Sequence, residues 1–200
     1  MIALLVATRN PHKTRELQQI LGSDFTVCDL RAHSEISEIA ETGTSFEENA
    51  KLKALAVSRK LPGLVAADDS GLEVHALGGA PGIYSARYAG TNATNKERID
   101  KLLEELARVD AKKEQRSARF RCVLVLARNG DVLGTFEGIV EGQIADRPRG
   151  SHGFGYDPIF VPNGFQQTFG QLRPAEKNQL SHRARALKKL RAFLNSRASQ

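Results

Sequence analysis

The sequence predicts an α/β fold in which helices flank a mixed central sheet, and three observations support this. Apolar runs at Ile2–Ala7 and Leu64–Ala67 are typical of buried strands. Segments with apolar residues at helical spacing begin at capping signals such as Asn10. The dipeptide Asn129–Gly130 separates two strand-like segments and indicates a hairpin.

The length and charge of the chain limit its architecture and its partners. A chain of 200 residues is expected to form one domain, here residues 1–200, and its net charge of +6 favours an anionic partner. Much of the basic surplus lies in Ser181–Arg197, where leucines form a helical stripe and most basic residues lie off it. A solvated helix face explains that charge, so we expect no nucleic-acid partner.

Cysteine usage and the first residues indicate the compartment. Cys28 and Cys122 occur in strand-like segments without metal-ligand spacing, which predicts reduced core thiols in a cytoplasmic protein. The apolar segment Met1–Ala7 is too short for a signal peptide and lacks basic flanks. No segment approaches the length of a membrane span. We therefore expect no membrane partner.

The first strand is expected to lead into a strand-to-helix turn at Thr8–Lys13. Asn10 can cap the helix, Pro11 fits its first turn, and Gly22 follows its last apolar residue as a stop. The free backbone N–H groups at such a helix start point beyond the end of the strand. This geometry predicts an anion-binding site.

Two predicted helix starts carry cations. His12 and Lys13 lie in the first turn of one helix, and His182 and Arg183 follow Ser181, the expected cap of the last helix. The helix dipole disfavours a cation at this end by about 0.3–1 kcal/mol. One bound anionic ligand would explain why cations occur at both helix starts. The alternative is that both pairs of cations lie there by chance.

The second helix is predicted after an irregular acidic segment, with Thr44 and Glu47 forming a capping box. Its apolar face consists of Phe46, Ala50, Ala54, Val57 and Leu61. Asn49 and Lys53 lie four residues apart at the edge of this face. A lysine at such an edge usually extends to water, but Lys53 can instead reach a site shared with Asp69.

Two adjacent acids, Asp68 and Asp69, follow the apolar run Leu64–Ala67 and precede an expected turn at Ser70–Gly71. Paired carboxylates at a strand end supply the oxygen ligands that Mg²⁺ prefers. Successive strand side chains point to opposite faces, so only one acid can face a given site. Asp69, which is nearer the turn, is the candidate. The alternative is a turn with two exposed acids.

Later segments carry a further capping box and a glycine-rich cluster. Thr94 and Glu97 begin a third helix, and the second strand of the hairpin, Val132–Ile144, is expected to be interrupted by its glycines. Arg147–Pro158 combines glycines, aromatic residues and an acid. Glycines let a ligand approach the backbone, an aromatic ring can stack on a base, and an Asp can accept from ring N–H groups. The alternative is a bulged turn with core aromatics.

Together these motifs resemble the inosine triphosphate pyrophosphatase family, the house-cleaning enzymes that hydrolyse dITP and XTP. The resemblance covers nearly the whole chain, and its many motifs in register make it specific. The motifs are T-x-N-x-x-K at Thr8–Lys13, E-T-G at Glu41–Gly43, F-x-E-N-A-x-x-K-A at Phe46–Ala54, A-D-D-S-G-L-x-V at Ala67–Val74, G-G-A-P-G-I-Y-S-A-R-Y at Gly78–Tyr88, G-F-G-Y-D-P-x-F at Gly153–Phe160 and E-K-x-x-x-S-H-R at Glu176–Arg183.

The resemblance implies an activity, a cofactor and a fold. The activity is hydrolysis of ITP, dITP or XTP to the monophosphate and pyrophosphate, which keeps deaminated purines out of DNA and RNA. It also implies one Mg²⁺ per subunit, two lobes with a substrate cleft between them, and a cytoplasmic homodimer. Asp69 occupies the motif position that resembles the family's proton acceptor and metal ligand. Glu41 and Asp68 would belong to the metal environment.

The resemblance also implies a set of substrate contacts. Residues of the first turn and two lysines would hold phosphates, Ser70 would contact the substrate, and the remaining residues would shape the base and sugar end. The full set is Thr8, Arg9, Asn10, Pro11, His12, Lys13, Lys53, Ser70, Phe154, Gly155, Tyr156, Asp157, Lys177, His182 and Arg183. Arg9 and His12 stand where many relatives carry smaller residues, which leaves the local shape of the phosphate loop open.

Other interpretations remain open at this point. The positive charge is compatible with a nucleic-acid-binding module, which would leave the acids and glycine loops without a role. The triplet Asp69–Gly71 after an apolar strand is compatible with a homodimeric aspartic protease, which would leave both anion-type turns unexplained. A related pyrophosphatase acting on other modified nucleotides is the nearest enzymatic alternative.

Overall fold

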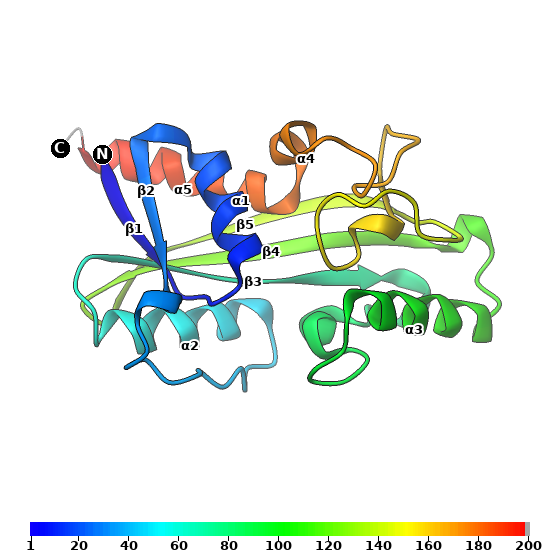
Figure 1. Cartoon of the computed structure of the whole chain (residues 1–200), viewed down its shortest axis with the longest axis horizontal. Coiled ribbons are helices and arrows are strands. Elements are labelled where there is room, and N and C mark those ends of the chain that lie inside the picture. Colours follow the sequence, from blue (N-terminus) through cyan, green and yellow to red (C-terminus); the bar gives the residue numbers. More distant parts are fainter. Residues whose placement is uncertain (199–200) are drawn as a thin grey trace. The chain divides into compact units, whose positions relative to one another are not determined.

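A computed structural model describes residues 1–198, and the chain divides into two compact units (Figure 1). Unit 1 contains Met1–Asp69, Cys122–Gly138 and the residues from His182 onward. Unit 2 contains Ser70–Arg121 and Ile139–Ser181. Because three strands each contribute residues to both units, a single domain over residues 1–200 stays our prediction, as does a substrate cleft between two lobes.

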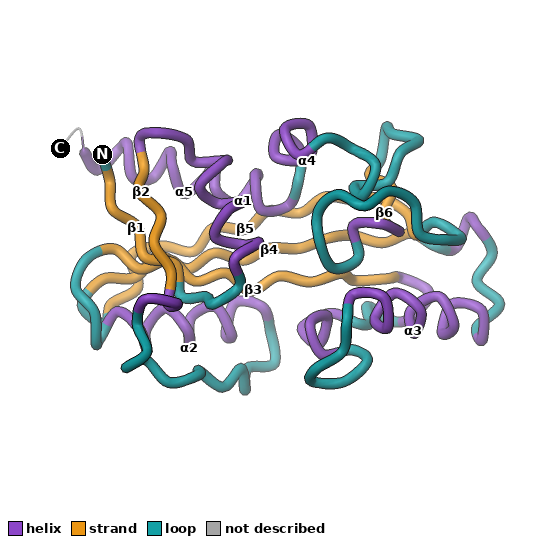
Figure 2. The backbone as a smooth tube through the Cα atoms, viewed as in Figure 1, coloured by secondary structure: helices purple, strands orange, loops and turns teal. Residues whose placement is uncertain are grey.

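The strands are β1 (Ile2–Val6), β2 (Phe25–Asp29), β3 (Leu64–Val74), β4 (Ser117–Arg128), β5 (Asp131–Ile144) and β6 (Phe160–Pro162). The α-helices are α1 (Pro11–Leu21), α2 (Phe46–Ser58), α3 (Asn95–Arg108), α4 (Pro174–Leu180) and α5 (His182–Ala198). Short 3-10 turns connect several of them, and Figure 2 shows that the chain between β5 and β6 is mostly loop.

The six strands form one mixed sheet in the order β2-β1-β3-β4-β5-β6. β1 pairs in parallel with both β2 and β3, so that Leu4 lies opposite Val27 on one side and Leu64 on the other. β6 pairs antiparallel with the end of β5, with Gly142 opposite Pro162. The mixed sheet with flanking helices predicted from the sequence is confirmed.

Three local features predicted from the sequence are present in the structure. Asn10 caps α1, and its side chain accepts from the His12 N–H at 2.9 Å. Thr94 and Glu97 form both bonds of the expected capping box. Asn129–Gly130 joins β4 to β5 with φ of 55° and 85°, the left-handed backbone that a two-residue hairpin requires.

The start of α2 differs from the expectation by one residue. Ser45, and not Thr44, is the N-cap, and its side chain accepts from the Glu48 N–H at 3.1 Å. The Glu48 carboxylate in turn accepts from the Thr44 backbone N–H at 2.7 Å. The predicted box between Thr44 and Glu47 is therefore wrong, because two adjacent hydroxyl residues and two adjacent acids offer equivalent pairings.

The turn expected at Ser70–Gly71 is absent, because β3 runs without a break from Leu64 to Val74. Asp68 and Asp69 lie inside this strand and are 2% and 6% exposed, which excludes the alternative of an exposed turn. β5 likewise continues through its glycines, and was wrongly predicted to be interrupted. Pairing with neighbouring strands outweighs the local preference of glycine and serine for turns.

Unit 1 has its own hydrophobic core. α1 and α5 contribute the leucines Leu17, Leu187 and Leu190, which pack with residues of the sheet such as Leu4 and Leu124. α2 lies against the opposite face of the sheet (Figure 1). A strand of unit 1 thus has a helix pair over one face and a single helix over the other.

Gly138 on β5 allows α5 to lie directly on the sheet. A Cβ atom at this position would meet the His182 carbonyl oxygen at 2.0 Å and the Ala186 nitrogen at 2.5 Å. No side chain fits in that space. Glycine at position 138 therefore lets the first turn of α5, which carries His182 and Arg183, pack in direct contact with the backbone of β5.

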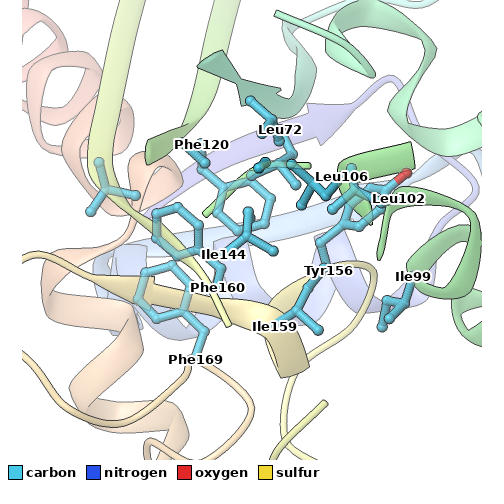
Figure 3. Packing of buried hydrophobic residues seen from close by; sticks show 14 of the residues in the cluster. Leu72, Ile99, Leu102, Leu106, Phe120, Ile144, Tyr156, Ile159, Phe160 and Phe169 are labelled. Carbon is cyan, nitrogen blue, oxygen red and sulfur yellow. The ribbon is translucent and has the colours of Figure 1, made fainter. Parts of the chain in front are cut away.

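Unit 2 is built around an aromatic core (Figure 3). The ring of Phe120 on β4 lies 4.7 Å from that of Phe160 and 6.1 Å from that of Phe169, measured between centroids. Leu102 and Leu106 of α3 pack against the same cluster. This core holds the loop that leads into β6.

The two cysteines differ in burial. Cys122 on β4 is buried, and burial raises the pKa of its thiol to about 12, as expected for an unreactive core residue. Cys28 is exposed on β2, an edge strand, so its prediction as a core thiol is wrong. Among residues 1–198, no helix has the length and apolar composition to cross a bilayer.

Candidate active site

The adjacent acids of β3 organise the charged side chains of unit 1. Asp68 contacts cations from α1 and α5, whereas Asp69 contacts side chains of α2. Neighbouring side chains of a strand point to opposite faces, and the helices of unit 1 cover both faces. The two acids therefore belong to two different clusters on opposite sides of the same strand.

The Asp69 cluster contains one buried lysine between two carboxylates. The Lys53 Nζ lies 2.6 Å from Glu41 Oε1 and 3.3 Å from Asp69 Oδ1. It also donates to the backbone oxygen of Asp68 at 2.8 Å. Lys53 is 8% exposed, so it does not extend to water as lysines at the edge of an apolar face usually do.

Burial and charge set the protonation of this cluster. Burial would lower the pKa of Lys53, but the carboxylates of Asp69, Asp68 and Glu41 outweigh it and raise that pKa. Burial raises the pKa of Asp69, Lys53 opposes that shift, and the Glu41 carboxylate adds to it. Asp69 thus has a raised pKa, which suits a group that takes up a proton.

Asn49 is the second partner of Asp69 on α2. Its side-chain nitrogen donates to Asp69 Oδ2 at 3.2 Å, and its side-chain oxygen accepts from the Gly43 N–H at 2.8 Å. The side chain is fully buried. Each Asp69 oxygen therefore has one donor from α2, Asn49 on one side and Lys53 on the other.

The Asp68 cluster contains two cations and a second acid. Lys13 of α1 lies 3.0 Å from Asp68 Oδ1, and the Nη2 atom of Arg183 lies 3.2 Å from Asp68 Oδ2. The Nη1 atom of Arg183 pairs with Glu16 of α1. Arg183 is 1% exposed, so its guanidinium lies wholly inside unit 1.

The cations decide the charge of Asp68. Burial would raise the pKa of the carboxyl, but Lys13, Arg183 and Lys53 together hold that pKa well below its usual range. Burial would likewise lower the pKa of Arg183, and the Glu16 and Asp68 carboxylates raise it. The cations therefore favour the ionised form of Asp68, and this carboxylate anchors the start of α5 to α1.

The turn from β1 to α1 contains the remaining unit 1 candidates. The Thr8 hydroxyl accepts from the Asn10 N–H at 3.1 Å, which shapes the turn before α1. The Arg9 guanidinium donates to the His33 carbonyl at 3.3 Å and to that of Ile36. Pro11 and His12 are exposed at the helix start. Arg9 thus fixes the loop after β2, a role that its sequence position did not suggest.

The Glu41 and Asp69 carboxylates offer a metal-binding possibility. No group of three His, Cys, Asp or Glu side chains within residues 1–198 is arranged to hold a metal ion. Mg²⁺, however, is commonly bound through one or two carboxylates together with water and substrate phosphates. The oxygen donors that meet at Lys53 fit that mode, whereas the Asp68 carboxylate is already paired with Lys13 and Arg183.

Unit 2 contains a third charged cluster, formed by the loop before β6 and by α4. Asp157 Oδ2 accepts from the Lys177 Nζ at 2.7 Å and from the Phe154 backbone N–H at 2.7 Å. The Lys177 ammonium lies 5.2 Å from the centroid of the Phe154 ring. A Cβ on Gly153 would meet Asp157 Oδ2 at 2.0 Å, so glycine is needed there. The glycines expected to admit a ligand also let the loop fold around this ion pair.

The other residues expected at the substrate lie on several elements and have different surroundings. Tyr156 is 3% exposed, and its hydroxyl donates to the Ser85 carbonyl at 3.0 Å, so it belongs to the core of unit 2. Gly155 has a φ of 62°. Ser70 is half-buried on β3, and His182 is the buried first residue of α5.

Sequence reasoning did not assign two residues that the structure places in these clusters. Glu16 is 8% exposed and pairs with Arg183, 167 positions away in the chain. In the sequence, Glu16 could have been recognised as an acid next to Leu17 on the apolar side of α1, a placement that is uncommon in a surface helix. Asn49 was seen at the edge of an apolar face but given no role.

Comparisons with known proteins agree with this picture. The Ham1 family model matches residues 4–193. The dITP/XTP pyrophosphatase of Bacillus subtilis is 48% identical over 193 residues, with 96% of each chain covered. That of Oceanobacillus iheyensis is 44% identical over 198 residues, covering 98% of this chain and 100% of the relative.

Solved structures show the same similarity. A HAM1 protein from Coxiella burnetii has 42% sequence identity and a TM-score of 0.87, covering 98% of this chain and 100% of that one. The Ham1 protein of Staphylococcus aureus has 41% identity and a TM-score of 0.84, covering 98% of this chain and 99% of that one.

Proposed function

The chain belongs to the Ham1 family, and we propose that it hydrolyses non-standard purine nucleoside triphosphates such as dITP, ITP and XTP. The products are the nucleoside monophosphate and pyrophosphate. This activity removes deaminated purine nucleotides before they enter DNA or RNA. Relatives that match over nearly their whole length are named for this activity, which supports the proposal.

The observation that carries the proposal is the placement of Asp69 between Lys53 and Asn49. A buried carboxylate with a raised pKa is suited to accept a proton from water. The Glu41 carboxylate meets the same lysine, which concentrates oxygen donors beside the proposed base. The arrangement is therefore suited to hydrolysis of a triphosphate held with a divalent cation.

The cofactor of the proposed reaction is Mg²⁺, one per subunit, held by Asp69 and Glu41. When bound it would neutralise and polarise the triphosphate. Asp69 accepts the proton of the water that attacks the α-phosphorus. Lys53 keeps both carboxylates in place before substrate arrives, and Asp68 acts by orienting Lys13.

Phosphate binding is assigned to the first turn of α1 and to the lysines. The backbone N–H groups that follow Asn10 form an anion site, and Lys13 adds a positive charge there. Lys177 of unit 2, buried beside Asp157, is the third proposed phosphate contact. These lysines would stabilise the charge that develops on the leaving pyrophosphate.

Base selection is assigned to donors that face the purine 6-position. His182 and Arg183 are the proposed donors to a 6-oxo group, and Phe154 is the proposed stacking partner of the ring. Adenine presents its own donor at that position, and leaving a donor buried without an acceptor costs about 1–3 kcal/mol.

The alternatives from other protein classes fit the structure less well. An aspartic protease places two acids face to face on loops, whereas Asp69 lies inside a strand beside a lysine. A nucleic-acid-binding module would give the buried clusters no role. We also propose a homodimer in the cytoplasm, in keeping with the family resemblance and with the two free thiols.

A substrate panel tests the proposal. Purified protein is incubated with ITP, dITP, XTP, ATP and GTP, with either Mg²⁺ or EDTA, and both pyrophosphate and orthophosphate are measured. We expect pyrophosphate from the first three nucleotides with Mg²⁺ and none with EDTA. Release of orthophosphate instead of pyrophosphate, or turnover of ATP and GTP alone, would contradict the proposal.

A further inference from the structure

The carboxamide of Asn49 contacts both acidic segments of the Asp69 cluster. Its nitrogen donates to Asp69 Oδ2 at 3.2 Å, and its oxygen accepts from the Gly43 N–H at 2.8 Å. The two partners determine which end is which, because a backbone N–H can only donate and a carboxylate can only accept. A fully buried amide with both ends bonded has a fixed orientation.

The Gly43 contact is tight enough to fix the loop backbone. A Cβ on Gly43 would meet the Cβ of Glu48 at 2.6 Å and the Asn49 Oδ1 at 2.8 Å. The loop therefore lies directly on the first turn of α2. Glu41 is two residues earlier in the same loop, and its carboxylate meets Lys53 at 2.6 Å. Asn49 thus holds the backbone next to the second carboxylate.

The Asp69 contact complements that of Lys53. Asn49 and Lys53 are four residues apart on α2 and so lie on the same face of the helix. One donates to Oδ2 of Asp69 and the other contacts Oδ1, so the carboxylate cannot rotate without losing a partner. Its remaining lone pairs stay available for a water proton or a cation.

We propose that Asn49 is a positioning residue that sets the spacing and orientation of the Asp69 and Glu41 carboxylates. This inference rests on the proposed function, because it assigns Asn49 to the same site. Asn49 acts through Asp69 and the Gly43 backbone and does not touch the substrate. An outer residue that orients a metal-binding carboxylate typically contributes 10–100-fold to metal affinity or activity.

The test compares Asn49→Ala with a matched control, Ser58→Ala. Ser58 is also buried on α2, and its hydroxyl accepts from the Gly130 backbone N–H at 3.2 Å, but it has no contact with Asp69. Both variants lose a hydrogen bond in which a side chain of α2 accepts from a backbone N–H, of Gly43 or of Gly130. The measurements are kcat and KM for ITP, Mg²⁺ affinity by calorimetry without nucleotide, and the thermal unfolding midpoint.

We expect Asn49→Ala to lower kcat and the Mg²⁺ affinity by about 10–100-fold while KM changes less than about threefold. Ser58→Ala should lower only the unfolding midpoint. If folded Asn49→Ala keeps kcat and Mg²⁺ affinity within twofold of the parent protein, Asn49 has a structural role alone and the inference is overturned.

A second variant covers the case in which Asn49→Ala does not fold. Asn49→Asp has the same shape and keeps the acceptor for Gly43, but it replaces the donor to Asp69 with an acceptor. We expect its kcat to fall at least tenfold, and an unchanged kcat contradicts the inference. Failure of the parent protein to hydrolyse ITP would instead overturn the proposed function, and the Mg²⁺ titration would still test the positioning by Asn49.

Discussion

Lys53 and Glu41 form an ion pair, 2.6 Å between Nζ and Oε1, in which the buried lysine also faces the buried carboxylate of Asp69. Lys53→Met keeps most of the apolar stem but removes the ammonium that both carboxylates face. We expect a loss of about 3–5 kcal/mol in the free energy of unfolding, as for other broken buried pairs, together with loss of turnover. Urea unfolding and a pyrophosphate-release assay measure the two effects.

The matched control for that variant is Lys51→Met, an exposed position on the same helix. It should change the free energy of unfolding by no more than about 0.5 kcal/mol and leave activity intact. Equal effects at both positions would mean that the buried lysine has no special role.

Asp69→Asn separates activity from stability. Because the pKa of Asp69 is raised in the folded protein, its ionised form costs stability at neutral pH, and a neutral isostere removes that cost. The NH₂ group of the variant would face a donor, Asn49 or Lys53, which offsets part of that gain, so we expect an unfolding midpoint close to that of the parent protein. Loss of a general base should lower kcat by about 10²–10⁴-fold. Turnover above a tenth of the parent rate would exclude Asp69 as the base.

Asp68 predicts a dependence of stability on acid. Its folded pKa lies below the ordinary value of 3.8, so its contribution is complete above that value and is lost as the pH falls below it. Asp68→Asn should cost about 3–5 kcal/mol at pH 7. The difference from the parent protein should shrink between pH 4 and pH 2, measured by urea unfolding across this range.

An exposed pair of unit 1 provides the comparison. Asp24 pairs with Arg191 at the surface, with side chains 63% and 45% exposed. Asp24→Asn should therefore cost less than about 1 kcal/mol at pH 7. A constant gap between Asp68→Asn and the parent protein down to pH 2 would contradict the assigned ionisation of Asp68.

The ion pair of unit 2 predicts an effect on substrate binding. Asp157→Asn removes the carboxylate partner of Lys177, which is only 4% exposed, while an amide oxygen can still accept from the Phe154 N–H. We expect a loss of about 3–5 kcal/mol in unfolding free energy and an increased KM for ITP. Glu176→Gln, in an exposed pair with Arg173 on the same helix, should leave KM unchanged.

Gly138 predicts a packing effect on α5. Gly138→Ala places a methyl group against the His182 carbonyl and the Ala186 nitrogen, which are backbone atoms that cannot rotate away. We expect a loss of about 1–3 kcal/mol in unfolding free energy. Gly134→Ala is the control, because the nearest neighbour of Gly134 is the side chain of Phe136 and not backbone. Thermal unfolding is measured for both variants, and Gly138→Ala should have the lower unfolding midpoint.

The sequence predicted features that depend on a few neighbouring residues. The cap at Asn10, the capping box from Thr94 to Glu97 and the Asn129–Gly130 hairpin each follow from local stereochemistry, and all are present. The family resemblance supplied the candidate residues at the site. Their identities came from motif positions, and their contacts came only with the structure.

Features that depend on distant residues could not be predicted from the sequence. Glu16 and Arg183 are 167 positions apart, and no spacing rule connects them. The Ser70–Gly71 dipeptide is a local turn signal, but it lies within a strand whose neighbours hold it extended. Cys28 sits in an apolar-looking strand, and its exposure follows from the position of β2 at the edge of the sheet.

Because β3 is unbroken, this chain can tolerate few insertions or deletions in that strand. Asp68 and Asp69 reach different partners only because consecutive residues alternate in direction, so one codon lost before them would move Asp69 into the place of Asp68 and Ser70 into the place of Asp69. Asp69 would then face Lys13 and Arg183, and the residue beside Lys53 would no longer be this acid. Insertions and deletions in proteins descended from this chain should therefore occur in loops, such as the one before β6, and not within Leu64–Val74.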